Sequence, residues 1–369
     1  MTIPANVATY NTSPEADTPV ALEPKYIPAL DGLRGVAVLL VIGLHYQKPY
    51  FELGWTGVDL FFVLSGFLIT KRLMENKDRP DRYALFYRNR ALRIMPLYYL
   101  MLVLFYFCVY FLVSAQNFHR FDLYTNNKAA WFLFLQNWVF DQHEATKEGH
   151  LVPLWSLAIE EQFYLIWPWF LYAFYTNKYF RQILWVIIAG VFLIRNGLYF
   201  FNGSRNLYTN TFCRIDSLVI GALTWFLVQK PLFTKKVMWM GITALVILMA
   251  GYTCIEGKDP RSPFSATVGY TAFAFLFASI LYTVVINPGS MASRILKNSF
   301  LRFTGKISYG IYVFHVPVII IARSKISPIL QEWHLPENLL LGIISILITY
   351  AISIGSYYYY ESYFLTRKK

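Results

Sequence analysis

The chain has 369 residues, of which 56% are hydrophobic and 19% aromatic, whereas only 15% are charged; its formal net charge is +12. An average soluble domain carries about 25% charged residues, so this composition excludes an ordinary soluble globular protein and indicates an integral membrane protein. The excess of Lys and Arg does not indicate a nucleic-acid-binding protein, because these residues flank long apolar segments instead of forming one basic patch.

The N-terminal residues 1–26 differ from the rest of the chain, because they are polar and contain scattered Pro, Glu and Asp. They lack the basic start and the short apolar core of a signal peptide, and we predict a disordered cytoplasmic tail. From residue 27 onward, successive apolar segments long enough to cross a bilayer predict an all-α, polytopic membrane helical bundle. About ten transmembrane helices are predicted, at residues 30–48, 56–73, 95–114, 155–175, 183–201, 212–229, 237–254, 265–286, 305–323 and 338–361.

An even number of spans places the N- and C-termini on the same side of the membrane. Most Lys and Arg residues of the predicted loops lie on that side, so the positive-inside rule makes both termini cytoplasmic. The predicted location is the cell inner (plasma) membrane, with a membrane domain at residues 27–366 and a basic cytoplasmic tail at 367–369.

Two ionisable residues, Arg34 and His45, lie eleven positions apart in the first predicted helix. A helix turns about 100° and rises about 1.5 Å per residue, so both side chains share one face and lie roughly 16 Å apart along the axis. This spacing places the arginine near one membrane surface and the imidazole near the midplane. An ionisable group at that depth is costly to bury and indicates a functional site, although histidines also form structural hydrogen bonds between membrane helices.

A basic segment precedes the third predicted helix, in the inner loop at residues 74–94, and contains Arg88, Arg90 and Arg93. Arg90 and Arg93 have i, i+3 spacing, which makes them neighbours on a helical surface. Two guanidinium groups so placed can bind one anionic group in a bidentate manner, and a phosphorylated ligand fits this pattern. The alternative is that these arginines only set the topology or bind anionic lipid.

Two adjacent carboxylates, Glu160 and Glu161, lie near the outer end of the fourth predicted helix. Adjacent helical residues point about 100° apart, so only one of the two can face a given pocket. Glu160 is a candidate for orienting or activating a hydroxyl acceptor, and Ser156, one turn earlier, is placed to hydrogen-bond it. The alternative is an intramembrane ion pair with Arg195 or Arg214.

Further charged residues lie near the outer ends of other predicted helices, with Asp59 in the second and Arg214 and Asp216 in the sixth. Unpaired charge in hydrocarbon costs several kcal/mol, so we expect these side chains to be mutual partners. A structural role is therefore the favoured interpretation for them.

The ninth predicted helix places Ser308, Tyr312 and His315 on roughly one face. His315 is a second candidate for a catalytic histidine. Pro317 follows in the same helix and is expected to bend it where a cavity opens.

Several segments together resemble the acyltransferase-3 family, the integral-membrane acyltransferases that include bacterial O-antigen and peptidoglycan O-acetylases. Each segment alone is a weak signal, but they occur in the family's order over about residues 27–361, and the ordered set is specific. The segments are LDGLRGVAVLLVIGLHY, GVDLFFVLSGFLIT, YRNRALRIMPLYYL, LQNW, LWSLAIEEQFYLIWP, RIDSLVIGAL and GKISYGIYVFHVPV.

The resemblance implies a membrane-bound O-acyltransferase that moves an acyl group, acetyl by analogy, from cytoplasmic acyl-CoA to a hydroxyl of a sugar, glycan or related acceptor in or across the membrane. The family's arginine and histidine pair falls on Arg34 and His45, and its Arg-x-x-Arg motif falls on Arg90 and Arg93. After the tenth predicted helix the sequence has only ThrArgLysLys, so a second transfer step by an appended domain is expected to be absent or supplied by another protein.

The expected partners are acyl-CoA, with acetyl-CoA the favoured donor, a glycan, lipid-linked sugar or small hydroxylated acceptor, and membrane lipid; no nucleic acid is expected. No metal is expected either, because the three cysteines show no CxxC spacing. Outer-loop tryptophans such as Trp155 either stack on sugar faces or anchor the chain at the membrane interface, and the second role is the commoner one.

The mechanistic hypothesis is that a pantetheine arm, on the order of 15–20 Å extended, covers the roughly 16 Å between Arg34 and His45. His45 then acts as a general base on the acceptor or accepts the acyl group itself, and the sequence leaves both roles open. The predicted CoA-binding residues are Arg34, Arg90 and Arg93, and the candidate catalytic residues are His45, Glu160 and Asp59. The candidate substrate-binding residues are Trp155, Arg214, Asp216, Tyr312 and His315.

The main rival hypothesis is a polytopic transporter or a lipid-binding membrane protein with a buried relay of His, Glu and Arg residues. Transporters often show paired halves with corresponding broken helices, and this sequence shows no such symmetry. Arginines that can bind phosphate, in line with a histidine deeper in the membrane, fit a donor thioester better.

Overall fold

The computed structural model describes residues 26–46, 50–112, 121–139, 149–230, 234–254 and 258–368. Helices make up most of these residues and no strand occurs among them, so the predicted all-α class is confirmed. The predicted N-terminal tail lies almost wholly outside the described residues, as does Lys369 of the predicted C-terminal tail.

Each predicted span overlaps a long helix of the described chain. These helices are α1 (Pro28–Tyr46), α2 (Thr56–Glu75), α3 (Arg82–Leu112), α6 (Trp155–Phe174), α7 (Phe180–Asn202), α8 (Thr211–Val228), α9 (Thr234–Cys254), η6 with α10 (Ser265–Gly269 and Tyr270–Ile286), α13 (Ser308–Lys325), and α15 with η7 and α16 (Glu337–Gly355, Ser356–Glu361 and Ser362–Leu365). The shorter elements are α4 (Asp122–Thr125), α5 (Lys128–Phe132), η3 (Gln136–Trp138), η4 (Val152–Leu154), α11 (Met291–Leu296), α12 (Ser299–Lys306) and α14 (Ser327–Glu332).

Seven helices of the described chain are long and apolar enough to cross a membrane, or eight if the bent pair α12 and α13 is one span. The helices α2 and α6 are not among these, and both carry charged residues inside, such as Asp59 in α2 and Glu160 in α6. The protein is therefore a multi-pass membrane protein, but fewer helices meet the length and hydropathy criteria than the ten that were predicted.

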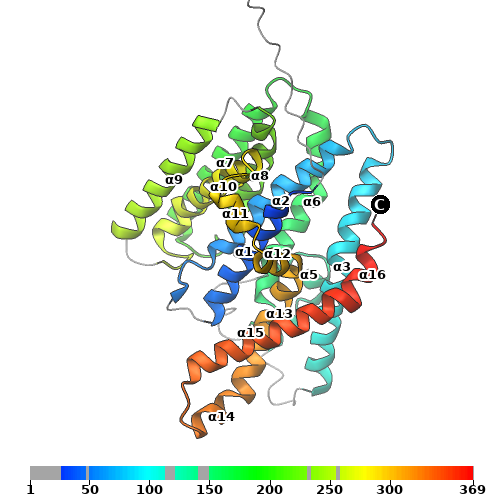
Figure 1. Cartoon of the computed structure of the whole chain (residues 1–369), viewed down its shortest axis with the longest axis vertical. Helices are drawn as coiled ribbons and strands as arrows, with labels where there is room; N and C mark the ends of the chain where they lie inside the picture. Colours follow the sequence, from blue (N-terminus) through cyan, green and yellow to red (C-terminus); the bar gives the residue numbers. More distant parts are fainter. Residues whose placement is uncertain are drawn as a thin grey trace, which may run out of the picture.

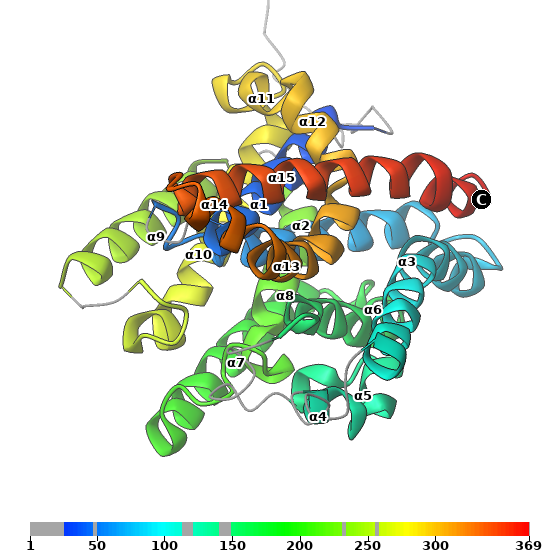
Figure 2. The same cartoon turned by 90° about the horizontal axis from the view of Figure 1, so that it is seen from below.

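The helices α1 and α2 occupy the centre of the bundle (Figures 1 and 2). In the same views α9 lies at one flank and α3 at the opposite flank, while the continuous helix α15–η7–α16 crosses the bundle and ends beside α3. The two central helices pack closely on others, α1 on α12 and α2 on α8. Residues on α1 and α2 are therefore surrounded by protein on most sides.

Glycines allow these central helices to approach each other's backbones. A Cβ added to Gly221 of α8 would lie 2.0 Å from the Val63 carbonyl oxygen of α2, and one added to Gly66 would lie 1.9 Å from the Leu218 carbonyl oxygen. Small residues in helix interfaces permit this close packing in membrane proteins. On the other side of the centre, a Cβ on Gly305 of α12 would lie 1.8 Å from the carbonyl oxygen of Asp31 in α1.

Replacing Gly221 with Ala is expected to destabilise the protein by about 1–3 kcal/mol, because the added methyl group overpacks the interface between α2 and α8. The measurement is thermal or denaturant unfolding of the purified protein in detergent. Gly190→Ala in α7 is the matched control, since a Cβ there meets nothing within 4 Å, and it should leave stability unchanged or slightly raised. Equal loss of stability in both variants would contradict this packing argument.

The helix α3 begins at Arg82 and α2 ends at Glu75, so the loop predicted at residues 74–94 is shorter than expected and covers residues 76–81. Arg90 and Arg93 lie on the helix itself, which continues through Pro96. Tyrosine hydroxyls from other elements donate to carbonyl oxygens near this proline, Tyr309 to Ile94 at 2.7 Å and Tyr360 to Pro96 at 3.2 Å. Neighbouring side chains of this kind allow a proline inside a membrane helix, which is why Pro96 does not mark a helix start.

The sharp bend near the ninth predicted helix falls at Ile307, between α12 and α13, which meet at 73°. The helix α13 runs through Pro317, where a bend was expected. The bend falls at Ile307 because the two helices pack on different partners. The helix α12 packs against α1 at Gly305, whereas α13 packs beside α15.

Candidate functional site

A cavity of about 300 Å³ lies between α1, α2, α3, α6 and the segment that follows α16. Its seven cationic lining residues are Arg34, Lys71, Arg72, Arg82, Arg90, Arg93 and Lys368. Glu75 is the one carboxylate among its described lining residues, and we call the site the basic cavity. Arg34 also forms a 3.4 Å ion pair with Asp31, which leaves a large excess of positive charge for an anionic ligand.

A second cavity, here called the inner cavity, shares Arg34, Arg90 and Arg93 with the basic cavity and has a volume of about 80 Å³. Its remaining lining residues are Phe61, Ser65, Ile94, Ser156, Leu157, Glu160, Tyr164, Ser308, Tyr309 and Tyr312. The three arginines predicted to bind one anion thus lie where the two cavities meet. The inner cavity extends from them between α2, α6 and α13.

Glu160 is held in the inner cavity by two hydroxyl donors. Ser65 donates to its Oε1 at 2.7 Å and Tyr164 donates to its Oε2 at 3.0 Å. The Arg90 guanidinium lies 5.4 Å from the centre of the Tyr164 ring, so this tyrosine links the carboxylate to the cationic group. The hydrogen bond expected from Ser156 to Glu160 is not formed, because the Ser156 hydroxyl pairs with Tyr312 at 2.6 Å.

Two histidines meet deeper in the bundle. The rings of His45, in the last turn of α1, and His315, in α13, lie edge to face with centroids 4.8 Å apart. The Nδ1 atoms lie 2.9 Å from the Val41 carbonyl oxygen and 2.7 Å from the Tyr312 carbonyl oxygen, respectively. Because a carbonyl can only accept, each neutral ring carries its proton on Nδ1 and has a free lone pair on Nε2.

The two histidines differ in accessibility. His315 is fully buried, and its Nε2 has no hydrogen-bond partner among the described residues. His45 as a whole residue is only partly buried. Of the two free lone pairs, the one on His45 is therefore the better placed to meet a substrate.

Tyr312 connects the inner cavity with the histidines. It lines that cavity, and its ring centroid lies 5.7 Å from that of His315. Its hydroxyl lies 2.7 Å from the Pro153 carbonyl oxygen, to which it can donate, as well as 2.6 Å from Ser156. His45 lines neither the basic nor the inner cavity, and Tyr312 and Ser156 lie in the wall of the inner cavity near the histidines.

Four other buried charges form two ion pairs away from these cavities. Arg214 pairs with Asp59 at 2.7 Å and Arg195 pairs with Asp216 at 2.9 Å, with all four side chains fully buried. The expected pairing is confirmed for Asp59 and Arg214, whereas Asp216 pairs with Arg195, which was expected only as an alternative partner of Glu160. Asp59 binds Arg214 and does not contact His45. None of Asp59, Arg214 and Asp216 lines either cavity, so these three predicted site residues lie apart from the other predicted site residues.

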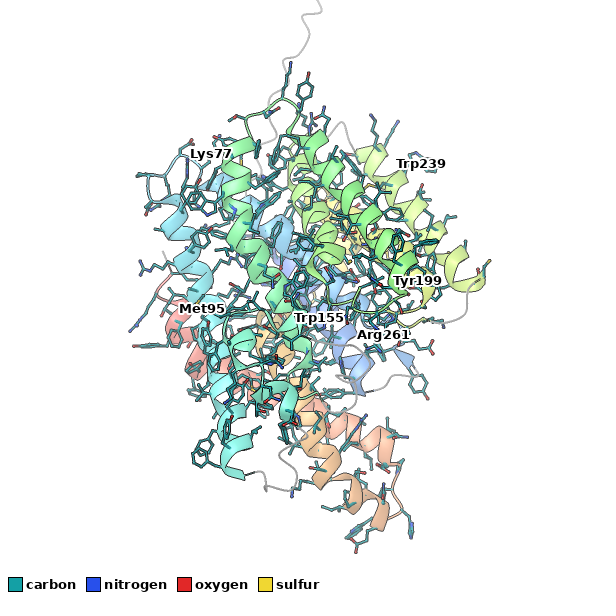
Figure 3. All side chains as sticks on the ribbon, turned by 180° about the vertical axis from the view of Figure 1, so that it is seen from behind. Lys77, Met95, Trp155, Tyr199, Trp239 and Arg261 are labelled. Carbon is teal, nitrogen blue, oxygen red and sulfur yellow. The ribbon has the colours of Figure 1, made fainter. Side chains whose placement is uncertain are left out.

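Trp155 is another predicted substrate-binding residue that lies elsewhere. Only 4% of it is exposed, and its ring packs 4.7 Å from that of Tyr208. In Figure 3 Trp155 is labelled near the centre of the view, whereas Trp239 lies near its edge. Trp155 is a core residue, and the expected roles as a sugar platform or a membrane anchor are wrong for it.

The structure also adds residues that the sequence analysis did not assign to the site. Ser65, Tyr164 and Lys368 line the cavities. The first two lie within quoted family segments and the third in the predicted basic tail, but none was assigned to the site. For Tyr164 the available signal was its i, i+4 spacing from Glu160, which makes the two residues neighbours on one helical face. No group of three His, Cys, Asp or Glu side chains suited to a metal ion occurs in the part of the chain that the structure describes.

Comparison with known proteins tests the family that the motifs predict. The family profile described as "Acyltransferase domain" matches residues 27–358, which is most of the chain. The chain belongs to the acyltransferase-3 family. The predicted family is confirmed, and this match favours an acyltransferase over the transporter hypothesis.

Three relatives with O-acetyltransferase names illustrate the similarity. YrhL of Bacillus subtilis is 31% identical over 365 residues, which cover 91% of this chain and 54% of that protein. The peptidoglycan O-acetyltransferase OatA of Listeria monocytogenes is 30% identical over 361 residues, covering 92% of this chain and 56% of that protein. The O-acetyltransferase OatA of Staphylococcus aureus is 30% identical over 324 residues, covering 82% and 52%.

The chain thus spans about half the length of these relatives. No solved structure matches it.

Proposed function

We propose that the protein is an O-acyltransferase of the plasma membrane that transfers an acyl group, acetyl in the simplest case, from cytoplasmic acyl-CoA to a hydroxyl of a glycan. The observation that carries this proposal is the pair of adjoining cavities, which share Arg34, Arg90 and Arg93 and extend to the neighbourhood of His315 and His45. A polyanionic head and a long thin arm are the two parts of CoA that such a shape accommodates. The relatives named as O-acetyltransferases support acetyl as the group transferred.

The basic cavity suits the nucleotide end of CoA. Seven cations oppose a single carboxylate there, and guanidinium groups bind phosphate oxygens in a bidentate manner. Tyr172 also lines this cavity, with the Arg82 guanidinium 4.4 Å from its ring centre, and offers an aromatic face for a base. In this proposal the pantetheine arm enters the inner cavity past Arg90 and Arg93.

His45 is the proposed catalytic residue. Its Nδ1–H bond to the Val41 carbonyl fixes the tautomer, so Nε2 can take the proton from the acceptor hydroxyl. The acceptor oxygen then attacks the thioester carbonyl, the carbon–sulfur bond breaks, and the CoA thiolate leaves. The alternative route, in which Nε2 first accepts the acyl group, uses the same lone pair and passes the acyl group to the acceptor in a second step.

Glu160 is the proposed positioning residue on the donor side. It accepts hydrogen bonds from Ser65 and Tyr164 in the wall of the inner cavity, where the thioester end of the arm would pass. A carboxylate fixed by two donors gives this cavity a defined polar wall. For the arm to reach His45, the contact between Tyr312 and Ser156 has to open.

The function as a whole is tested in cells. Mass analysis of surface glycans and secreted metabolites from cells with and without the gene is expected to reveal an O-acyl group that depends on the gene. Restoring the gene with His45→Ala should not restore that group. Identical acyl content in the presence and absence of the gene would overturn the proposed function.

Arg90→Ala is expected to raise the KM for acetyl-CoA by about tenfold or more, because a charge-assisted hydrogen bond to phosphate contributes about 1.5–3 kcal/mol. The turnover number at saturating donor should change much less. The measurement is steady-state kinetics of the purified protein with acetyl-CoA as the varied substrate.

Arg205→Ala is the matched control for this variant, since Arg205 is exposed and lines neither cavity. It removes the same charge and should leave the KM unchanged. An unchanged donor KM in Arg90→Ala would count against phosphate recognition at the basic cavity.

A further inference from the structure

One cation of the basic cavity, Lys368, comes from the segment that follows α16. This segment is held on α3, because Arg88 Nη2 donates to the Arg367 carbonyl oxygen at 3.3 Å. The Arg367 side chain folds back onto Tyr363, with its guanidinium 4.0 Å from the ring centre and in hydrogen-bond contact with the hydroxyl. The position of α16 beside α3 can be followed in Figure 2. The segment therefore forms one wall of the cavity.

The surroundings of Lys368 are strongly positive. The titratable and charged groups that face it or share its cavity are Arg34 of α1, Lys71, Arg72 and Glu75 of α2, Arg82, Arg90 and Arg93 of α3, Tyr172 of α6 and Glu361 of η7. Burial, together with the positive charge of Arg93, Arg90 and Arg34, lowers the pKa of Lys368 to about 7. An empty cavity thus holds this amine largely neutral in mildly alkaline solution, although an exposed lysine would be fully charged.

We propose that Lys368 is a proton-coupled ligand of the donor's phosphate groups: its amine takes up a proton from solvent when they bind, and the resulting ammonium contacts them. This inference rests on the proposed function and identifies a residue that controls donor affinity. The phosphates of CoA bring several negative charges among the cations, so the repulsion that keeps the amine neutral is replaced by attraction. The contact between Arg88 and the Arg367 carbonyl oxygen holds the neighbouring Lys368 at the cavity.

The consequence is a pH-dependent donor affinity. Binding that requires one proton weakens about tenfold per pH unit above the pKa of the free amine and below that of the bound ammonium. With about 7 for the free cavity and an ordinary lysine value of about 10.4 for the complex, affinity should fall about 20-fold between pH 7.5 and pH 9.0. The secondary ionisation of a phosphate group, near pH 6, is complete over this range and does not contribute.

The test is isothermal titration calorimetry of the full chain in detergent with S-methyl-CoA, a thioether that has no free thiol and cannot donate an acyl group. Titrations in two buffers of different ionisation enthalpy count the protons taken up, and about one is expected for the wild type at pH 8.5. Lys368→Gln should bind weakly at every pH and take up no proton. Lys368→Arg, which is always charged, should restore tight binding and lose the pH dependence.

Lys235→Gln is the matched control, because it removes the same charge from an exposed residue of α9 that lines neither cavity. It should behave as the wild type. The inference is overturned if Lys368→Gln keeps the proton uptake and the pH dependence of the wild type. If S-methyl-CoA does not bind but ATP binds with the same Lys368-dependent proton uptake, the role of Lys368 in phosphate binding is supported and CoA is not the donor. If neither compound binds, the role of Lys368 and the proposed CoA donor are both overturned.

Discussion

His45→Ala is expected to lower the turnover number of acyl transfer by about 10²–10⁴-fold, the usual contribution of a general acid or base. The structure supports His45 because its Nδ1 is committed to the Val41 carbonyl, which leaves the Nε2 lone pair for a substrate, and because the residue is not fully buried. The measurement is release of CoA from acetyl-CoA by the purified protein in the presence of acceptor. Melting temperature and donor KM should change little, since the ring lines neither cavity.

Two asparagine variants separate chemistry from packing. His45→Asn keeps an N–H donor for the Val41 carbonyl and removes the basic nitrogen, so it should be as inactive as His45→Ala. His315→Asn likewise keeps a donor for the Tyr312 carbonyl, and because His315 is fully buried it should retain turnover within about tenfold. Normal turnover in His45→Asn together with an inactive His315→Asn would transfer the base role to His315.

The long helices could be predicted from the sequence because apolar segments of spanning length are separated by polar ones. The exception, the start of α3, shows the limit of that signal: the arginine-rich residues from Arg82 to Arg93 read as a loop, yet they form a helix whose one face lines the basic cavity. An amphipathic helix at a membrane surface has no long apolar run to identify it.

For the site, local spacing sufficed for one group of residues only. Arg90 and Arg93 are three positions apart, and both do line the same two cavities. The contacts between His45 and His315, and between Ser65 and Glu160, join residues far apart in the chain and depend on how α1, α2, α6 and α13 pack. A single sequence does not contain that information, because any of several polar residues on each helix has the same local pattern.

The partners within the buried ion pairs could not be predicted from the sequence either. Asp59, Arg214 and Asp216 on two helices were expected to be mutual partners, but nothing local indicated that Asp216 pairs with Arg195 of a third helix. In the structure the choice follows from packing, since α8 carries both Arg214 and Asp216 between α2 and α7. Arg214 therefore turns toward Asp59 of α2, and Asp216 toward Arg195 of α7.

Arg214→Met is expected to destabilise the protein by about 3–5 kcal/mol, because it leaves the Asp59 carboxylate buried without its partner. Both side chains are fully buried in the wild type, and the guanidinium also lies 4.0 Å from the Tyr270 ring centre. The measurement is the denaturant or thermal midpoint of the purified protein in detergent. Since the bundle is packed around this pair, a lower yield of folded protein should accompany the lower midpoint.

The double variant Asp59→Asn with Arg214→Met identifies the cause. It removes both charges, so it should recover a large part of the stability lost in Arg214→Met, as replacing a whole buried ion pair usually costs much less than breaking it. A double variant no more stable than the single one would show that lost packing, and not an unpaired charge, is responsible. If Arg214→Met instead keeps its stability and raises the KM for the acceptor, Arg214 binds substrate, the role for which it was also a candidate.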